Sequence, residues 1–500
     1  MIMKSFISKM TALLLVLLLV LALGACEKKN TSSFGENAGD FNLDFGTEEQ
    51  ENGEETQSGE KAESGTDSKN TAKPSSGKVA VKNVETKKAA AGVTNADALS
   101  WKELAAQIPA AVKGKTIRVY SWNPAKEVTG AEKVIADFQK QTGIKVKWVV
   151  GGYEDYTDKV AAMINAGDAP DLIRMVCPDM GRVAVASDIR ASTGYDYNGA
   201  IWDKRITDQY TFKGKLYAVN LKNTLVQQPR VVLYRKSVIE TCKLEDPYAL
   251  WKAGKWNWDK MLSMAAIYKE MYPNNRDPIM TYNHTDLCNM TGNPLISFDG
   301  SKFVNNINNP NTVKQLREMI RLRTEGYTTG AFRHIAYYES GHVLFMLFNG
   351  IAMRTTNANM LSVKKEDDLY AVPIPTLRSD NAYELSEAEA YAVPKGAKNG
   401  EAVYYFLRYY LDADNYDKST YFANKQCAEV FDYCMTKKKF FTDITTLTLD
   451  RVSTGGNAAG LTDYIRFKGT AAQLNSQIDS LKPTFDLAVK KANELYEKLN

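Results

Sequence analysis

An α/β fold is the architecture that the sequence predicts for its long globular part. Short β-rich segments alternate there with segments whose apolar residues recur at helical spacing. Alternation at this pitch is typical of βαβ units that build a parallel sheet. The predicted strands lie at 115–121, 144–150 and 172–176, and the predicted helices between them at 130–141 and 153–166.

The same patterns continue to the end of the chain, and no internal repeat is visible. The last helix is amphipathic and contains Pro483, which we expect to bend it. Further strands are predicted at 215–219, 231–234, 343–348, 351–354, 370–374 and 390–393, and further helices at 258–268, 311–324, 400–411 and 471–499.

The beginning of the chain has the pattern of a secretory signal peptide. Lys4 and Lys9 precede an apolar stretch at 12–23, which is shorter than the about 20 residues that a membrane span needs. The small residues Gly24-Ala25, followed at once by Cys26, resemble the lipobox of bacterial lipoproteins. That resemblance implies lipid attachment at Cys26 and a place on the extracellular face of the bacterial cell membrane. A plain secreted protein with a chance cysteine is the alternative.

A polar segment follows the predicted cleavage site. It is rich in Gly, Ser, Thr, Asn, Glu and Lys and has few branched aliphatic residues. Such a segment cannot bury enough apolar surface to offset its chain entropy, so we expect a disordered linker. The sequence therefore divides into a signal peptide at 1–25, a lipid-anchored linker at 26–98 and a globular domain at 99–500.

Composition narrows the class of partner. The net charge is +4, with 63 Lys and Arg against 59 Asp and Glu, and this balance argues against nucleic acid. The 27 Tyr and 7 Trp suit sugar faces, but they suit ordinary half-buried packing equally well. Only 3 His are present, so we predict no metal or other cofactor. Beside Cys26 an odd number of cysteines remains, so they cannot all pair within one molecule, and we expect buried thiols at Cys177, Cys242, Cys288, Cys427 and Cys434.

Motifs of common enzymes are missing from the sequence. It has no H-E-x-x-H, G-x-S-x-G or G-x-G-x-x-G. Gly114-Lys115-Thr116 ends like a phosphate loop but precedes a strand, and 412–415 starts like a calcium loop but lacks its Gly and Glu. We therefore predict no enzyme. A secreted glycosidase needs only two carboxylates, so that alternative stays open, as does a surface scaffold or sensor lipoprotein.

Several short segments, in their order and spacing, resemble the extracellular solute-binding proteins of ABC importers, the family that includes maltose-binding protein. The resemblance covers roughly residues 114–500. The segments that carry it are Ser121-Trp122-Asn123, Gly167-Asp168-Ala169-Pro170-Asp171, Gly214-Lys215-Leu216-Tyr217-Ala218-Val219, Leu233-Tyr234-Arg235-Lys236, Gly254-Lys255-Trp256-Asn257-Trp258, Phe348-Asn349-Gly350-Ile351-Ala352-Met353, Pro373-Ile374-Pro375 and Tyr391-Ala392-Val393-Pro394-Lys395-Gly396-Ala397-Lys398.

The resemblance implies a two-lobed, periplasmic-binding-protein-like α/β fold with a ligand cleft between the lobes. It places lobe 1 at about 113–222 and 376–425, and lobe 2 at about 226–375 and 426–500. In this family a monomer closes around its solute by hinge bending, and an ABC permease receives the closed form. The presumed hinge crossing at 223–230 is longer and more polar than usual in the family, which leaves its geometry open.

Candidate ligand residues follow the predicted strands, because ligands of open α/β sheets bind beyond the carboxyl ends of strands. Trp122 and Asn123 follow the first strand, where the ring can stack on a sugar and the amide can bind a hydroxyl group. Tyr153 follows the second strand, and Asp179 follows the third. Packing of Trp122 against a helix, and capping of a helix near Gly181 by Asp179, are the structural alternatives.

Further candidates come from the presumed hinge and from the second half of the chain. Asn223 and Gln227 lie in the hinge crossing. Arg354 and Asn357 follow a predicted strand, and the resemblance implies ligand contact there. Glu389 precedes another strand, where it faces the cleft or is a surface acid.

The candidate side chains indicate the chemical class of the ligand. Arg354 can bind a carboxylate or phosphate through two hydrogen bonds, so an acidic sugar stays open. A neutral carbohydrate or oligosaccharide is the stronger prediction, because aromatic residues are plentiful and no basic cluster is visible. The sequence thus predicts a protein that captures an extracellular sugar and delivers it to a permease.

Overall fold

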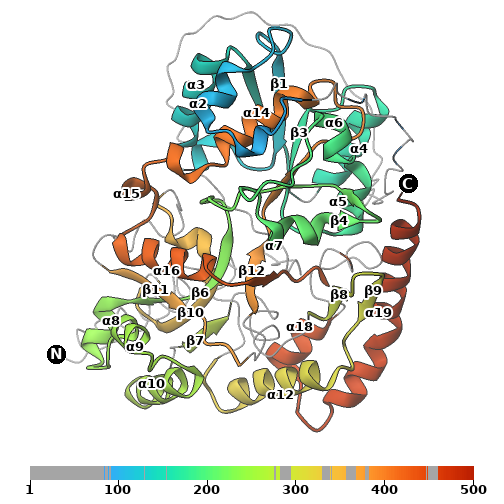
Figure 1. Ribbon diagram of the computed structural model, residues 1–500. Helices are drawn as coiled ribbons and strands as arrows, with labels where there is room; N and C mark the ends of the chain where they lie inside the picture. The colour runs from blue at the N-terminus through green and yellow to red at the C-terminus, as the bar shows by residue number, and fades with distance from the viewer. Residues whose placement is uncertain are drawn as a thin grey trace, which may run out of the picture. The chain divides into compact units, whose positions relative to one another are not determined.

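The chain folds around two β-sheets that are accompanied by helices (Figure 1). The predicted signal peptide, Cys26, Cys288 and Asn357 lie outside the described residues. The computed structural model describes residues 81, 84, 88, 92–128, 130–153, 155–274, 277–281, 294–328, 338, 340–355, 368–377, 382–445, 448 and 460–499.

The first sheet has the strand order β13-β3-β1-β2. β1 is parallel to both β2 and β3, which confirms the parallel sheet predicted from the alternation of strands and helices. β13 comes from much later in the chain and runs antiparallel to β3. The strands are β1 (Thr116–Ser121), β2 (Lys145–Val150), β3 (Leu172–Met175) and β13 (Ala390–Ala392).

The second sheet is built on one long central strand, β6. Its order is β14-β12-β6-β10-β7, and β11 also pairs with β6. β6 is antiparallel to its three partners, and its residues 228–234 are fully buried. The strands are β6 (Gln228–Arg235), β7 (Asp277–Thr281), β10 (Val343–Asn349), β11 (Leu369–Pro373), β12 (Ala382–Glu387) and β14 (Lys439–Phe441), and two short hairpins are β4 (Thr211–Phe212) with β5 (Lys215–Leu216) and β8 (Ile296–Phe298) with β9 (Phe303–Asn305).

Helices accompany both sheets (Figure 1). α14 packs against α2, α3 and α6 beside the first sheet, and α9, α10 and α16 pack against the second. The described helices are α2 (Trp101–Ala106), α3 (Ala131–Thr142), α4 (Tyr156–Asn165), α5 (Met180–Val185), α6 (Ile189–Thr193), α7 (Lys204–Thr207), α8 (Lys236–Thr241), α9 (Pro247–Lys252), α10 (Trp258–Met271), α12 (Pro310–Thr324), α14 (Gly400–Tyr410), α15 (Lys418–Tyr421), α16 (Lys425–Met435), α18 (Leu461–Asp463) and α19 (Leu474–Glu497).

Two antiparallel chain segments, residues 219–229 and 385–391, connect the two sheets. The first runs from the β5 hairpin into β6, and the second runs from β12 into β13. Asn223, Gln227 and Gln228 lie on the first segment, and Glu387 and Glu389 lie on the second. Their residue pairs are Val219–Tyr391, Gln228–Glu387 and Pro229–Leu385.

The structure differs from the predicted elements at several places. The strand predicted at 215–219 ends at Leu216, as β5. Residues 350–353 form a 3-10 turn, η4 (Gly350–Met353), and not a strand, because the chain turns directly after β10 at a glycine packed tightly against Pro229. α4 begins at Tyr156, so Tyr153 lies in the loop before it. β12 belongs to the second sheet by its pairing with β6, although the predicted lobe 1 included its residues.

A short segment ahead of α2 packs onto the first sheet's helices. Residues 92–99 contain the turn η1 (Ala96–Ala98), whose Asp97 is held from three sides. One carboxylate oxygen accepts hydrogen bonds from Trp202 Nε1 at 2.8 Å and from the Tyr404 hydroxyl at 2.7 Å, and the other accepts from the backbone N–H of Gly199 at 2.8 Å. The body therefore includes residues that precede the predicted domain start at 99.

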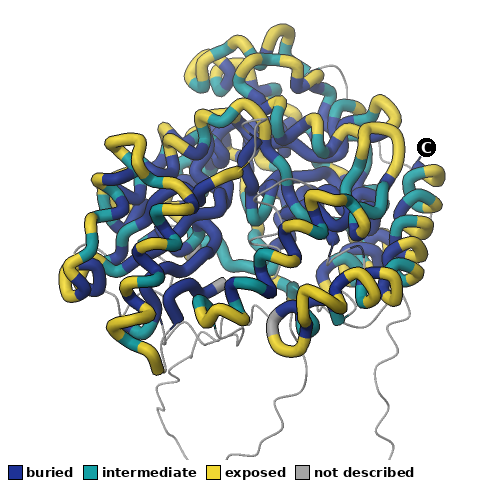
Figure 2. Tube along the Cα trace, turned by 90° about the horizontal axis from the view of Figure 1, so that it is seen from below, coloured by how far each residue is buried: buried dark blue, intermediate teal, exposed yellow. Residues whose placement is uncertain are grey.

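Burial follows the two sheets, as Figure 2 shows by its dark blue interior and yellow outer turns. α19 alternates between buried and exposed residues, as an amphipathic helix does, and it continues through Pro483. None of the helices in the described part of the chain is long and apolar enough to cross a membrane. The described cysteines are buried thiols, as expected: Cys177, Cys242, Cys427 and Cys434.

Candidate functional site

The carboxyl ends of β1, β2 and β3 lie at one edge of the first sheet, because the three strands are parallel. Trp122 and Asn123 follow β1, Tyr153 follows β2 and Asp179 follows β3. Glu389 precedes β13, which runs antiparallel to β3, so it lies at the same edge. Five of the predicted ligand residues therefore gather at one place.

Trp122 lies at the centre of this group. Its ring meets Tyr153 edge-on, with 5.3 Å between the ring centroids, and it meets Tyr156 edge-on at 4.9 Å. The guanidinium carbon of Arg174 lies 4.3 Å from the ring centroid, and that of Arg182 lies 5.6 Å from it. Part of the indole surface that we assigned to sugar stacking is thus in contact with arginine, a cation–π arrangement.

A buried ion pair anchors the site to the sheet. Arg174, on β3, donates from Nε and Nη2 to the two carboxylate oxygens of Glu389, both at 2.7 Å. Its third nitrogen, Nη1, donates to Asn123 Oδ1 at 2.7 Å. The side chain of Glu389 is 3% exposed, so the expectation of a surface acid is wrong. Such a fork-to-fork pair fixes the orientation of both side chains.

The backbone around Glu389 is held by amide side chains of the first crossing segment. Gln227 Nε2 donates to the Glu389 carbonyl oxygen at 2.7 Å, and Gln227 Oε1 accepts from the Glu389 N–H at 3.1 Å. Asn220 Nδ2 donates to the same carbonyl at 2.6 Å. Next to them, Gln228 Nε2 donates to Glu387 Oε2 at 2.7 Å. The two crossing segments are thus joined by side-chain as well as backbone contacts.

Asp179 caps a helix, which is the structural alternative stated for it. Its Oδ1 accepts from the N–H groups of Gly181 at 3.0 Å and Arg182 at 3.3 Å, at the start of α5. Its other oxygen lies 3.6 Å from Arg182 Nε. Arg182 in turn lies over the ring of Tyr153 at 5.6 Å. Asp179 therefore positions a buried arginine beside the aromatic pair.

Burial shifts the pKa values of several groups here. Desolvation raises the pKa of the Glu387 carboxyl group, and neighbouring Glu389 raises it further, while Arg174 opposes the change. Desolvation also raises the pKa of the Tyr153 hydroxyl group and raises that of the Cys177 thiol to about 12. These tyrosine and cysteine side chains are therefore neutral at physiological pH. They can offer hydrogen bonds but no charge.

The remaining predicted residues are placed differently. Arg354 is buried, and its Nη2 donates to the carbonyl oxygen of Val226 in the first crossing segment at 2.8 Å. Asn223 is exposed and donates to Asp412 Oδ1 at 2.9 Å. Asn357 lies outside the described residues. Ligand contact by each of the predicted residues stays a prediction.

Sequence reasoning missed the residues that organise the site. Arg174 had a visible signal, because a charge in the middle of the apolar run 172–176 needs a buried partner. Glu387 lies two residues before Glu389 and carries no separate signal. We call the following residues the Trp122 cluster: Trp122, Asn123, Tyr153, Arg174, Arg182, Glu387 and Glu389.

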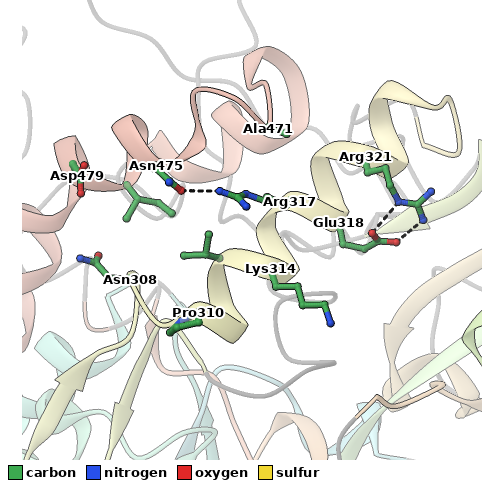
Figure 3. Close-up of a pocket in the computed structure, with 11 residues that line it drawn as sticks. Asn308, Pro310, Lys314, Arg317, Glu318, Arg321, Ala471, Asn475 and Asp479 are labelled. Carbon is green, nitrogen blue, oxygen red and sulfur yellow. Dashed lines mark hydrogen bonds and ion pairs between the residues drawn. The ribbon is translucent and has the colours of Figure 1, made fainter.

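A separate groove of about 760 Å³ lies between α12 and α19 (Figure 3). Arg317 reaches across it from α12 and donates to Asn475 Oδ1 of α19 at 3.1 Å, and Arg321 pairs with Glu318 along α12. None of the residues predicted to bind ligand lines this groove. Within the described residues, no group of three or more His, Cys, Asp or Glu side chains is arranged to hold a metal ion.

The two sheets, the paired crossing segments and the polar group at the strand ends define a two-lobed binding protein. Residues 133–421 match the family of bacterial extracellular solute-binding proteins, and the chain belongs to this family. Members of this family bind solutes, as the sequence predicts. No curated protein matches the chain in sequence.

Solved structures confirm the predicted two-lobed fold. The sugar-binding protein MalE of Xanthomonas citri is 14% identical with a TM-score of 0.55, and the match covers 77% of this chain and 100% of that one. The galacto-N-biose/lacto-N-biose I-binding protein of Bifidobacterium longum, solved with lacto-N-biose, is 15% identical with a TM-score of 0.55, covering 75% and 98%. An extracellular solute-binding protein of Staphylococcus aureus, solved with maltose, is 14% identical with a TM-score of 0.53, covering 76% and 98%.

Proposed function

We propose that this protein captures an extracellular carbohydrate at the Trp122 cluster and delivers it to an ABC permease. The observation that carries the proposal is the convergence of aromatic and hydrogen-bonding side chains at the carboxyl ends of β1, β2 and β3. Rings with polar neighbours match the alternating apolar faces and hydroxyl edges of a sugar. Structural neighbours solved with lacto-N-biose and with maltose support the same ligand class.

The crossing segments connect capture to closure. Gln227, Gln228, Glu387 and Glu389 lie on these segments and also contact one another within or beside the Trp122 cluster. A ligand that bonds to this group contacts the residues that must move when the lobes bend. Binding then favours the closed form by the difference in its contacts with the two forms. The permease is the partner that reads the closed form.

Lipid at Cys26 would hold the protein at the outer face of the membrane, where a monomer meets the permease at high local concentration. Cys26→Ser tests this part of the proposal. The variant should leave the membrane fraction and appear in the medium, while its affinity for ligand stays that of the wild type. A variant that remains membrane-bound would contradict the anchor.

The function is tested by measuring the melting temperature of the protein with a panel of neutral oligosaccharides. A ligand that binds only the folded state raises the melting temperature, by an amount that grows with ligand concentration. Chromatography of the sugars afterwards should show them intact, whereas a glycosidase would release products. A panel that produces no shift at millimolar sugar would overturn the proposal.

Two variants locate the site. Arg182→Ala removes a cation of the Trp122 cluster and should abolish most of the shift. Arg317→Ala, in the groove between α12 and α19, removes the same side chain elsewhere and should leave the shift unchanged. The opposite pattern would place the ligand in the groove of Figure 3.

A further inference from the structure

One carboxylate of the Trp122 cluster stays accessible. The side chain of Glu389 is 3% exposed, and Arg174 uses both of its oxygens. Glu387 is 25% exposed, and its Oε2 lies 3.7 Å from Arg174 Nη2, beyond hydrogen-bond distance. Gln228 Nε2 donates a hydrogen bond to the same oxygen at 2.7 Å. A carboxylate has about four acceptor positions, so Glu387 keeps acceptors that a ligand can reach.

Two buried polar atoms beside Glu387 have no hydrogen-bond partner among the described residues. Arg182 Nη1 is a donor on a side chain that is 4% exposed, and Gln228 Oε1 is an acceptor on a residue that is 1% exposed. Leaving such a buried atom unsatisfied is unfavourable. Gln228 bonds directly to Glu387, and the charge of Arg182 acts on the Glu387 carboxyl group. One atom thus lacks an acceptor and the other lacks a donor, and a hydroxyl group offers both.

Among the described residues, the charged groups that act on Glu387 and the groups paired with them balance one another. The cations are Arg174, Arg182 and Arg354, and the anions that pair with them or act on them are Asp179, Glu387 and Glu389. A neutral ligand preserves this balance. A carboxylate placed beside Glu387 would bring two anions together in a partly buried site, where their repulsion is weakly screened.

We propose that Glu387 sets the charge class of the ligand. Its free acceptor positions bind hydroxyl groups of a neutral sugar, and its charge excludes a sugar that carries a carboxylate at the same position. This inference rests on the proposed function and deepens it. Glu389, which the sequence favours, is the structural partner of Arg174, and Glu387 is the selecting residue.

Calorimetry with the full chain tests the proposal. The probes are neutral gluco-, xylo- and galacto-oligosaccharides and the corresponding uronic-acid oligosaccharides. We expect the wild type to bind a neutral sugar at least about tenfold more tightly than its uronic-acid counterpart. In Glu387→Gln the ratio of the two affinities should move toward the acidic sugar by about tenfold or more, because the repelling charge is gone.

Two controls separate charge from shape and folding. Glu387→Asp keeps the charge, so it should keep the preference for the neutral sugar even where both affinities fall. Glu240→Gln makes the same chemical change on exposed α8 and should behave as the wild type. An unchanged ratio in Glu387→Gln, or a wild type that prefers the acidic sugar, overturns the inference while sugar binding stands. A wild type that binds neither sugar class overturns the proposed function and this inference together.

Discussion

Arg174 and Glu389 form a two-pronged ion pair between β3 and the residue just before β13, with both hydrogen bonds 2.7 Å long. The pair joins a parallel strand of the N-terminal βαβ unit to a chain segment that lies more than 200 residues later. Burial alone would lower the pKa of Arg174, but the nearby carboxyl groups, Glu389 first and Glu387 next, raise it above its ordinary value, so the guanidinium stays charged. The site is therefore built on a charge pair that the fold brings together.

Removing one partner of this pair should be strongly destabilising. Arg174→Met leaves the Glu389 carboxylate buried without its cation, and a broken buried pair typically costs about 3–5 kcal/mol. Urea unfolding followed by circular dichroism measures the free energy of unfolding. The double variant Arg174→Met/Glu389→Gln should recover much of the loss, because neither member of the pair then carries a charge.

Lys204→Met is the matched control for that prediction. It breaks the exposed ion pair with Asp208, where the two side chains are 83% and 59% exposed. Exposed pairs contribute about 0–1 kcal/mol, so the free energy of unfolding should change little. Equal losses in Lys204→Met and Arg174→Met would show that burial of the Arg174 pair has no energetic importance.

Trp122 should contribute to ligand affinity through its ring. Trp122→Ala removes the apolar surface and the cation–π contact with Arg174, so we expect sugar binding to weaken roughly tenfold to hundredfold. Trp122→Phe keeps an aromatic face and should lose less. Isothermal titration with a sugar from the panel measures both variants, and Trp251→Ala, on α9, is the control. If Trp122→Ala binds the sugar as tightly as the wild type does, the ring does not contact the ligand.

Asp443 should make stability depend on pH. Burial raises the pKa of this carboxyl group to about 6, above its ordinary value of about 3.9. Between these values the folded state binds more protons than the unfolded state, so the free energy of unfolding falls as the pH rises from about 4 to about 6. Asp443→Asn cannot titrate. Its stability relative to the wild type should therefore increase by up to about 3 kcal/mol between pH 4 and pH 7.

Urea unfolding at the two pH values measures that difference. Asp432→Asn, an exposed site on α16, should follow the wild type at both. The difference in free energy of unfolding between Asp443→Asn and the wild type could be the same at pH 4 and pH 7. That result would show that Asp443 titrates alike in the folded and unfolded chains.

Gly400 should tolerate no side chain. A Cβ atom there would lie 2.0 Å from the backbone oxygen of Ser192, at the contact between α14 and α6. Because backbone cannot rotate away as a side chain can, Gly400→Ala should lower the free energy of unfolding by about 1–3 kcal/mol or more. Thermal melting measures the loss. Gly152→Ala meets only the end of the Asp155 side chain and should cost clearly less.

The predictability of the fold varied with the range of the interactions. The alternation between 115 and 176 predicted β1 to β3 and their helices to within a few residues, because local periodicity decides those elements. The sequence predicts a strand where the structure has the turn η4, because a short run of apolar residues is compatible with a strand and with a buried turn. What decides there is the tight approach of Gly350 to Pro229, a contact between distant parts of the chain.

Residues of the candidate site were predictable only where they lie close to one end of a predicted strand. Trp122 and Tyr153 were found by that rule, and the structure brings them together. Arg174, Arg182 and Glu387 were not found, because their importance comes from partners that are distant in sequence or from burial that a single sequence does not reveal. The sequence also offered Glu389, which the structure places beside Trp122 by its ion pair with Arg174.

The two crossing segments give this protein a particular evolutionary constraint. Gln227, Gln228, Glu387 and Glu389 are at once the residues beside the candidate ligand and the covalent route between the lobes. A substitution that retunes specificity there also alters the stiffness of the joint. A variant with altered ligand specificity at these positions is therefore expected to have an altered equilibrium between the open and closed forms. A substitution at Tyr153, which lies in the loop before α4, is therefore expected to alter specificity with less effect on the joint.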